Sequence, residues 1–578
     1  MSEKRVKLLP LVIFVLLATL MVRLGTTRAA QDADANETHS LSGETTSNAL
    51  AIQESLRPVV IHSSKNDVSA ALRSITPRQS APGEIREIPL LPLPKSRINS
   101  EPDASFVDSV LQGSTLASAQ SMPPPIQNFE GVSNVDDVLP PDPNGDVGPN
   151  HYVQTVNLSF AIWDKTGTLL YGPADNNTLW IGFGGACEET NNGDPIVLYD
   201  HLADRWFMSQ FALPFFPFGP FYQCIAVSQS GDPTGAWYRY EYVISETKLN
   251  DYPKFGVWPD AYYITVNQFD EATFSWGGQG VGAFERDQML NGQPADLIFF
   301  DLFTINPNFG GMLPSDLDGP PPPPGTPNYF AQVDDDAWGV APSDRLSIWE
   351  FHVDWSDPLN STFGIAGMPD VVLDIAPFDS RFGFRCTLLR DCIAQPFVPR
   401  FSFLDVISDR LMYRLQYRTF GSYQTLVTNH TVNASQSEAP QAGVRWYELR
   451  DSGGGWTIYQ QGTFAPDSDN RWMASAAMDG GGNIAVGYTV SGQATFPSIR
   501  YAGRLAGDPP GALPQEEATL IEGGGSQVHR ASRWGDYSMM AVDPTDDCTF
   551  WFTHEYYPAF RLYQWHTRIG SFKFQSCP

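Results

Sequence analysis

The sequence predicts an all-β fold for residues 126–578, and more specifically a β-propeller of about seven four-stranded blades. Aromatic residues make up 13% of the chain, and 49 glycines and 47 prolines punctuate short alternating runs such as Tyr152–Asn157. Such runs are typical of β-strands bounded by turns. No amphipathic helical pattern of useful length is present, and the region is too long for one β-sandwich. These observations favour a repeat architecture.

Self-comparison of the sequence supports the repeats. Asp146–Asn157 matches Gly256–Asn267, and Asp251–Asp260 resembles Asp536–Thr545, each as a turn followed by a strand. The units begin near residues 146, 194, 251, 312, 397, 469 and 535. Their spacing fits the ~40–50 residues of a blade plus loop insertions. A single blade cannot bury both of its faces, so closure of the ring would complete the core.

The chain begins with features of an export signal. Basic residues precede the apolar run Leu8–Val22, and Thr27-Arg28-Ala29 suits signal peptidase. The run of about fifteen residues is short for a transmembrane helix, although an uncleaved N-terminal anchor stays open. We therefore expect a signal peptide or anchor over residues 1–30. Residues 31–125 are rich in Ser, Ala and Pro, which predicts a disordered spacer before the propeller domain.

Charge and cysteine content narrow the partners and the compartment. The 36 Lys and Arg against 65 Asp and Glu give a net charge of -29, which excludes nucleic acid and anionic lipid as expected partners. The six cysteines predict disulfides in a secreted, periplasmic or cell-surface protein. Fifteen connectivities are open, and the pairs nearest in sequence are Cys187 with Cys224, Cys386 with Cys392, and Cys548 with Cys577.

One motif suggests a calcium site. Asp142, Asn144 and Asp146 alternate along the chain as oxygen ligands do in the first half of a calcium loop. Val153 stands at the twelfth place, where an EF-hand has Glu, so the motif is not an EF-hand. A cluster of Asx turns that caps the first blade is the alternative. Asp334–Asp336 and Asp467–Asp469 are further acidic loops.

Recognisable catalytic motifs are few. No Gly-x-Ser-x-Gly elbow and no His-Glu-x-x-His pair is present in the sequence. Sialidases use propellers and combine arginines with an Asp acid and a Tyr/Glu pair, which suits oxocarbenium chemistry. The candidates for such a site here are Asp536, Tyr537, Glu555, Arg471, Arg500 and Arg533. Units such as Asn470-Arg471-Trp472 and Arg533-Trp534 recur along the chain, however, and this recurrence favours packing or hydrogen bonding between blades over one catalytic centre.

One segment predicts an exposed contact surface. The loop 214–221 is too rich in proline to be a strand, and its phenylalanines, Phe215, Phe216, Phe218 and Phe221, could stack on a ligand.

At Gly231–Gly235, Asp251–Asp260 and Arg533–Ser538 the chain resembles large secreted bacterial β-propeller proteins of unassigned function, over about residues 128–578. The resemblance implies fold and compartment and transfers no catalytic residue. We therefore expect an exported binding or scaffold protein for an extracellular glycan or surface protein, with calcium as a candidate cofactor. The alternative is a glycoside hydrolase or lyase on the same scaffold. A membrane would be involved only through an uncleaved N-terminal segment.

Overall fold

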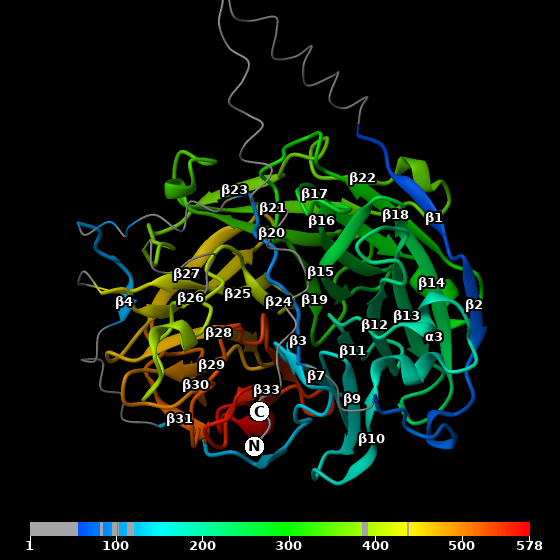
Figure 1. Ribbon diagram of the computed structural model, residues 1–578. Coiled ribbons are helices and arrows are strands. Elements are labelled where there is room, and N and C mark those ends of the chain that lie inside the picture. The colour runs from blue at the N-terminus through cyan, green and yellow to red at the C-terminus, as the bar shows by residue number, and fades with distance from the viewer. Residues whose placement is uncertain are drawn as a thin grey trace, which may run out of the picture.

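The computed structural model describes residues 56–80, 85–94, 101, 103, 105–112, 121–383, 386, 391–435 and 439–577. Within this part of the chain the strands form seven blades around a central axis (Figure 1). The prediction of an all-β propeller with about seven blades is therefore confirmed. The predicted signal segment, residues 1–30, lies outside the described residues and stays a prediction.

Four consecutive strands build each of the first three blades. Blade 1 contains β7 (Asn144–Val147), β8 (His151–Val156), β9 (Ser159–Asp164) and β10 (Leu169–Asp175). Blade 2 contains β11 (Ile196–Asp200), β12 (Arg205–Ala212), β13 (Phe221–Ser228) and β14 (Trp237–Ser245). Blade 3 contains β15 (Lys248–Val257), β16 (Tyr262–Asp270), β17 (Trp276–Phe284) and β18 (Asp296–Asp301).

The next three blades vary this plan once. Blade 4 contains β19 (Leu313–Leu317), β20 (Asn328–Asp334) and β21 (Arg345–His352), and β21 pairs with both β22 (Thr362–Phe363) and β23 (Val371–Asp374). Blade 5 contains β24 (Met412–Thr419), β25 (Gln424–Asn433), β26 (Ala442–Asp451) and β27 (Thr457–Phe464). Blade 6 contains β28 (Asn470–Met478), β29 (Ile484–Ser491), β30 (Ser498–Arg504) and β31 (Gln515–Ile521).

Blade 7 closes the ring with strands from both ends of the chain. It contains β32 (Met539–Val542), β33 (Thr549–Tyr556) and β34 (His566–Lys573), and its outermost strand is β5 (Gln127–Glu130), antiparallel to β34. The first strand of each blade is innermost, and these strands contact one another in sequence until β32 meets β7. Pairing of β5 with β34 thus fixes the two ends of the propeller to each other and leaves no open sheet edge there.

The segment before the propeller differs from our expectation. β1 (Val59–His62) adds a fifth strand to blade 3 beside β18, and β2 (Lys65–Val68) adds one to blade 2 beside β14. Farther on, β3 (Arg86–Glu87) pairs with β6 (Val138–Leu139), and β4 (Leu111–Gln112) pairs with β27 of blade 5. For these residues the prediction of a disordered spacer was wrong. The composition of the segment predicts disorder because it could not form a core of its own. The segment is ordered because its strands pair with the edges of existing sheets.

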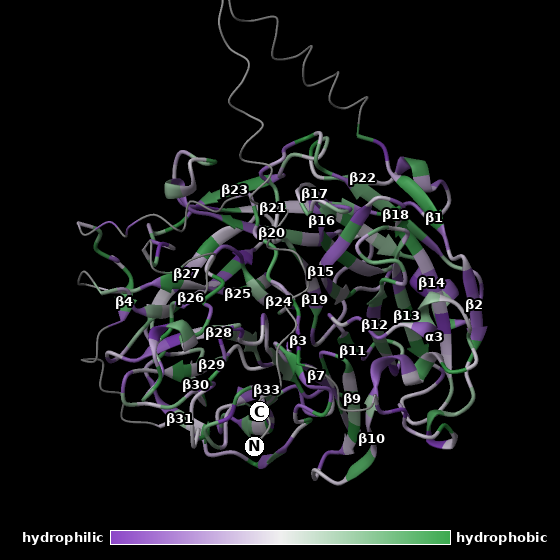
Figure 2. Ribbon diagram, viewed as in Figure 1, coloured by the Kyte–Doolittle hydropathy of each residue, from purple (hydrophilic) through white to green (hydrophobic). Residues whose placement is uncertain are grey.

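Hydropathy along these added strands fits their positions. In Figure 2, β1 is largely hydrophobic, whereas β2 is largely hydrophilic. Ile61 of β1 packs against the main core, and Asp67 of β2 forms an ion pair of 2.7 Å with the buried Arg239 of blade 2. Both strands cover blade edges that would otherwise be free to pair with another chain.

Helices are short within the described residues. They are α3 (Ala186–Glu189), α4 (Arg286–Leu290), and the 3-10 turns η1 (Leu72–Ser74), η3 (Asn176–Trp180), η4 (Asp336–Trp338), η5 (Pro358–Asn360) and η7 (Arg400–Ser402). A search of the described residues found no helix with the length and hydropathy required to cross a membrane.

The core lies between the blades and is rich in large aromatic side chains. Trp472 of blade 6 packs against Trp534, which in turn stacks on Tyr557, with ring centroids 5.9 Å and 5.8 Å apart. Such contacts each contribute about 0.5–1.5 kcal/mol beyond the area that they bury. They join neighbouring blades and so position the loops that link them.

Three disulfides join the six cysteines: Cys187–Cys224, Cys386–Cys392 and Cys548–Cys577. These are the pairs nearest in sequence. Structural disulfides persist in oxidising compartments, so they support the expectation of an extracytoplasmic protein.

Candidate functional site

All seven innermost strands begin at the same end of the central axis, which we call the mouth. A residue with a left-handed backbone lies before each of these strands or within its first half. In chain order these residues are Asp142, Asp194, Tyr252, Gly311, Ile407, Met473 and Ser532. Non-glycine residues adopt positive φ rarely, and such strain concentrates at functional sites. The repeated turn brings polar side chains from several blades together.

These side chains form a group that we call the axial cluster. β15 contributes three members from a bulge between Asp251 and Lys254, where its register with β16 shifts. A bulge can redirect side chains next to an active site. The cluster comprises Asp142, Asp194, Asp251, Tyr252, Lys254, Arg410, Arg533, Asp536 and Tyr537. All but the half-buried Asp251 are buried.

Lys254 lies at the centre of the cluster. Its Nζ lies 3.5 Å from the ring centroid of Tyr252 and 3.8 Å from that of Tyr537, and it donates a hydrogen bond of 3.0 Å to the carbonyl of Pro253. Burial lowers the pKa of Lys254 to about 8, against the opposing effect of nearby carboxylates. A lysine that titrates near neutrality and is held between two aromatic faces is a candidate for chemistry.

Three carboxyl groups of the cluster, those of Asp142, Asp194 and Asp251, have raised pKa values. Burial, reinforced by Asp536, raises the pKa of Asp194 to about 6 although Lys254 opposes the shift. Burial and the neighbouring Asp194 raise the pKa of Asp251 to about 8. Burial also raises the pKa of Asp142 well above its usual range. Asp251 therefore carries a proton at neutral pH, as a general acid must.

Two arginines balance this charge. Arg533 forms ion pairs with Asp405 and Asp536, at 2.6 Å and 2.7 Å. Arg410 is paired with Asp409 at 2.8 Å, and its guanidinium lies 4.7 Å from the ring centroid of Tyr252. Asp536 is thus ion-paired with Arg533, whereas burial raises the pKa of Asp251, so these two carboxyl groups at the mouth have different environments.

The structure brings together some of the residues proposed from sequence. Arg533, Asp536 and Tyr537 belong to the axial cluster. Glu555 lies beside it on β33, where it accepts a hydrogen bond of 2.9 Å from the amide of Gly535, and burial raises its pKa well above the usual range.

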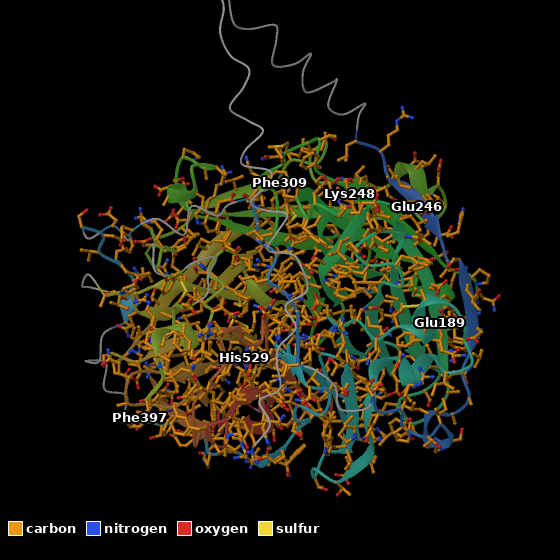
Figure 3. All side chains as sticks on the ribbon, in the orientation of Figure 1. Glu189, Glu246, Lys248, Phe309, Phe397 and His529 are labelled. Atoms are coloured by element: carbon orange, nitrogen blue, oxygen red, sulfur yellow. A yellow bond between two sulfur atoms is a disulfide. The ribbon has the colours of Figure 1, made fainter. Side chains whose placement is uncertain are left out.

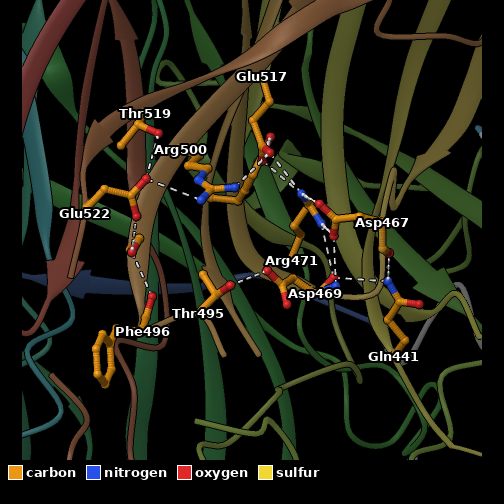
Figure 4. Close-up of polar contacts among 12 residues, drawn as sticks. Gln441, Asp467, Asp469, Arg471, Thr495, Phe496, Arg500, Glu517, Thr519 and Glu522 are labelled. Carbon is orange, nitrogen blue, oxygen red and sulfur yellow. Dashed lines mark hydrogen bonds and ion pairs between the residues drawn. The ribbon is translucent and has the colours of Figure 1, made fainter. Parts of the chain in front are cut away.

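Arg471 and Arg500 do not reach the axial cluster. Figure 4 shows them in a separate network on blade 6, where Arg471 pairs with Asp467 and Glu517 at 2.8 Å and 2.9 Å. Arg500 pairs with Glu517 at 3.2 Å. Their carboxylate partners hold both arginines within blade 6, which favours a structural role for them over a place beside Asp536.

Sequence reasoning missed Asp194, Asp251, Tyr252, Lys254 and Arg410. The segment Asp251–Asp260 had been noticed only as a repeat unit. The burial of Lys254 would have indicated the site, because a charged lysine inside an innermost strand requires polar partners. Burial of a single lysine cannot be read from the sequence. Its place between the tyrosines and acids of two blades could have been inferred only with the blade order in hand.

The predicted calcium loop has other bonding partners. Asn144 accepts a hydrogen bond of 2.7 Å from the amide of Val197, and Asp146 accepts one of 2.7 Å from the amide of Tyr199. Asp142 accepts bonds from the amide of Asp536 and from Asn157. These contacts join blade 1 to blades 2 and 7, and they favour the alternative of a structural cap.

A different acidic group could hold a cation. Asp335, Asp336 and Asp344 place one oxygen each within 4.8 Å of one another, and of these Asp336 is exposed. Asp344 already accepts hydrogen bonds from the amides of Asp336 and Phe378. If calcium is the cation, millimolar calcium should raise the Tm of the wild-type chain by a few degrees, and Asp336→Asn should remove the shift. Scanning calorimetry with and without a chelator would decide this.

Exposed aromatic rings occupy the same end of the propeller as the mouth. Phe215, Phe216 and Phe218 are 61%, 51% and 54% exposed in the loop from β12 to β13. Phe221 is buried at the start of β13, so its assignment to an exposed surface was wrong.

A second aromatic group consists of the exposed Phe397 and Phe560 and the half-buried Phe496. Phe397 lies at the periphery of the ring in Figure 3, and its ring centroid is 6.1 Å from that of Phe496. Aromatic faces of this kind can stack on sugar rings.

The opposite end of the axis carries a cavity of about 260 Å³. Asp146, Asp316 and Asp318 line it together with Arg414, which forms ion pairs with both Asp316 and Asp318. Carboxyl groups thus outnumber Arg414 in this cavity.

The shifted carboxyls predict a pH dependence of stability. Burial raises the pKa of Asp146 and of Asp344 to about 7, and that of Asp251 to about 8. The folded chain therefore keeps protons that the unfolded chain releases near pH 4. Burial lowers the pKa of His554 to about 3, so up to about pH 6.5 the unfolded chain holds a proton on this histidine that the folded chain does not. Up to that pH, His554 makes the free energy of unfolding rise with pH, which opposes the effect of the carboxyls.

Between pH 6.5 and 7.5 the free energy of unfolding should consequently fall as pH rises. The slope is at most about 1.4 kcal/mol per pH unit for each carboxyl that titrates in this window. Urea denaturation at the two pH values would measure it. A flat or rising profile would show that these carboxyls ionise normally.

Comparison with known proteins identifies no family for this chain. No protein-family model and no curated protein matches the sequence. Among solved structures, the chain is similar to a PL25 ulvan lyase, with 12% identity and a TM-score of 0.32 over 82% of this chain and 96% of the lyase. It is also similar to a protein of unknown function from Dyadobacter fermentans, with 9% identity and a TM-score of 0.32 over 78% of this chain and 99% of that protein. A Hadza microbial sialidase gives 9% identity and a TM-score of 0.34 over 74% of each chain.

Proposed function

We propose that this chain hydrolyses a glycosidic bond of an extracellular polysaccharide at the mouth of the propeller. The observation that carries the proposal is the convergence of two carboxyl groups in different environments, Asp251 with a pKa of about 8 and Asp536 paired with Arg533. A protonated carboxyl and a carboxylate on either side of a scissile bond are the two groups that glycoside hydrolysis requires.

The roles follow from these environments. Asp251 donates its proton to the glycosidic oxygen as the C–O bond breaks, and Asp536 stabilises the positive charge that develops on the sugar ring. Water supplies the hydroxyl of the new reducing end, and its remaining proton returns to Asp251. Lys254 and the tyrosine rings form the wall of this site.

Hydrolysis fits the cluster better than a lyase reaction does. A lyase needs a base that removes a proton from carbon, and tyrosinate would be the obvious one here. Burial raises the pKa of Tyr537 well above its usual range, so this side chain stays protonated at neutral pH. The net charge of -29 further favours a neutral polysaccharide, since a strongly anionic polymer would be repelled.

A panel of neutral and acidic polysaccharides tests the proposal. New reducing ends from a neutral polymer are expected, with an optimum below the pKa of Asp251. Product with an unsaturated sugar, detected by its ultraviolet absorbance, would instead identify a lyase. Retention of a polymer without any product, by a chain in which the axial cluster is accessible, would contradict hydrolysis and support the second candidate, an extracellular binding protein.

The exposed aromatic rings favour that second candidate, because Phe216 stacks on Phe274 at 5.4 Å and leaves ring surface open to solvent. Phe216→Ala should weaken binding of a retained polysaccharide by twofold to about tenfold, the effect of about 0.5–1.5 kcal/mol expected for one aromatic contact. Affinity electrophoresis measures it. Leu170→Ala, at an exposed position near the start of β10 and at the other end of the propeller, is the matched control. Equal losses in both variants would contradict a role for the ring.

A further inference from the structure

Residues 85–94 lie over the mouth, and we call them the strap. At one end, the amide of Ile88 donates a hydrogen bond of 2.7 Å to Leu139, next to blade 1. The carbonyl of Ile88 accepts one of 3.1 Å from Nε of Arg533, the arginine that pairs with Asp536. Figure 1 shows β3 close to the centre of the ring. The strap thus contacts the axial cluster directly.

The other end of the strap is anchored across the mouth. Leu91 packs in the cluster of Phe221, Leu249 and Phe269, at the boundary of blades 2 and 3. Leu93 is buried, and a methyl group added at Gly311, just before β19, would meet both Leu93 and Arg410. Between Ile88 and Leu93 the chain therefore passes from blades 7 and 1 to blades 4 and 5, and the cluster lies beneath it.

Few backbone bonds hold this cover in place. β3 pairs over two residues, whereas β1 and β2 each pair over four. Pro89, Pro92 and Pro94 have no amide hydrogen to donate. Arg86 adds hydrogen bonds of 3.1 Å and 3.4 Å to the carbonyls of Asn191 and Asn192. These bonds, the bond from Arg533 and the apolar side chains of the strap contribute the rest of the attachment. A segment with this pattern can open without unfolding the blades.

We propose that the strap is an autoinhibitory cover, and that its displacement exposes the axial cluster to an extended polysaccharide chain. This inference rests on the function proposed above only in naming the ligand. The closed state explains how Lys254, fully buried in an innermost strand, can belong to a reactive site. Displacing the strap leaves β1, β2 and β4 on their blade edges, so the scaffold stays intact.

Chemical labelling of Lys254 tests the cover without relying on catalysis. In one variant, residues 86–93 are replaced by a Gly/Ser linker of equal length, which preserves the strands on either side. Reductive methylation followed by peptide mass spectrometry should leave Lys254 unmodified in the full wild-type chain and modify it at least tenfold faster in the variant. Replacement of Pro320–Pro324, at the other end of the axis, by Gly/Ser is the control and should leave Lys254 protected.

Ile88→Asp supplies a second variant that keeps the strap's length and places a negative charge beside the acidic cluster. It should also speed labelling of Lys254, whereas Val59→Asp on the exposed face of β1 should not. Hydrogen exchange of the wild-type chain should release the amides of residues 86–88 faster than those of β16. Equal protection of Lys254 in the open variants, or exchange of the strap only with global unfolding, would overturn the proposal.

The outcomes separate the cover from the chemistry. Faster labelling without new reducing ends from any polysaccharide would support the strap and contradict the proposed hydrolysis. Hydrolysis by the wild-type chain at the same rate as the open variant, with Lys254 labelled equally in both, would support hydrolysis and overturn the strap.

Discussion

Asp251→Asn should lower polysaccharide hydrolysis by about 10²–10⁴-fold, the usual contribution of general acid catalysis. The amide has nearly the shape of the protonated carboxyl and cannot donate a proton to the leaving oxygen. At pH 8 the same change should raise the free energy of unfolding, on the order of 1 kcal/mol, because it removes a group whose pKa burial raises. Activity and stability should therefore change in opposite directions.

Initial rates of reducing-end release from the strap-replaced chain, together with urea denaturation at pH 8, measure the two effects. Asp287→Asn, on the exposed side of α4, is the control and should change neither quantity. A loss of activity that accompanies a loss of stability would show that Asp251 is structural. Unchanged hydrolysis would remove it from the proposed mechanism.

The blades were predictable because each one is encoded locally. Alternating runs such as Tyr152–Asn157 and the turns before them define strands within a few residues of sequence. Closure of the ring was not predictable in this way. β5 pairs with β34 more than 400 residues away in sequence, as in the pairing of Glu130 with Arg568. Nothing in the sequence of either strand indicates which strand it pairs with.

The candidate site was only partly predictable for a related reason. Arg471 and Arg533 both precede a tryptophan and follow a turn, so their sequences gave no ground for separating them. Their partners differ. Glu517 on the outermost strand of blade 6 holds Arg471 within that blade. Asp405, from the segment between β23 of blade 4 and β24 of blade 5, holds Arg533 at the axis. Only the arrangement of the blades decides which carboxylate is in reach.

The burial of Lys254 also depends on packing that the local sequence does not predict. Its sequence neighbours Asp251, Tyr252 and Pro253 suggest an exposed turn, and lysine is normally exposed. A bulge in β15 turns it inward instead, toward Tyr537 of a blade that follows nearly 300 residues later. Local patterns predict that a strand begins there, and the packing of distant blades determines what its side chains face.

Arg533→Met should have the largest effect on stability, a loss of about 3–5 kcal/mol, because removing one partner leaves buried charge uncompensated. Arg533 is almost fully buried and pairs with both Asp405 and Asp536. Methionine keeps much of the apolar volume, so the loss reports on charge more than on packing. Since Arg533 also holds the carbonyl of Ile88, Lys254 should be labelled faster in this variant.

Urea denaturation compares this variant with Arg73→Met, which removes an exposed ion pair of 3.0 Å to Asp232 and should cost less than about 1 kcal/mol.

Adding Asp405→Leu to Arg533→Met should recover part of the stability, because it removes one of the two buried carboxylates that Arg533→Met leaves without a counter-charge. Recovery together with continued exposure of Lys254 would separate the two tasks of Arg533. Its charge stabilises the junction of blade 7, and its bond to Ile88 keeps the strap closed. A small loss in Arg533→Met, equal to that in Arg73→Met, would show that the charges at the mouth are solvated and that the strap does not bury them.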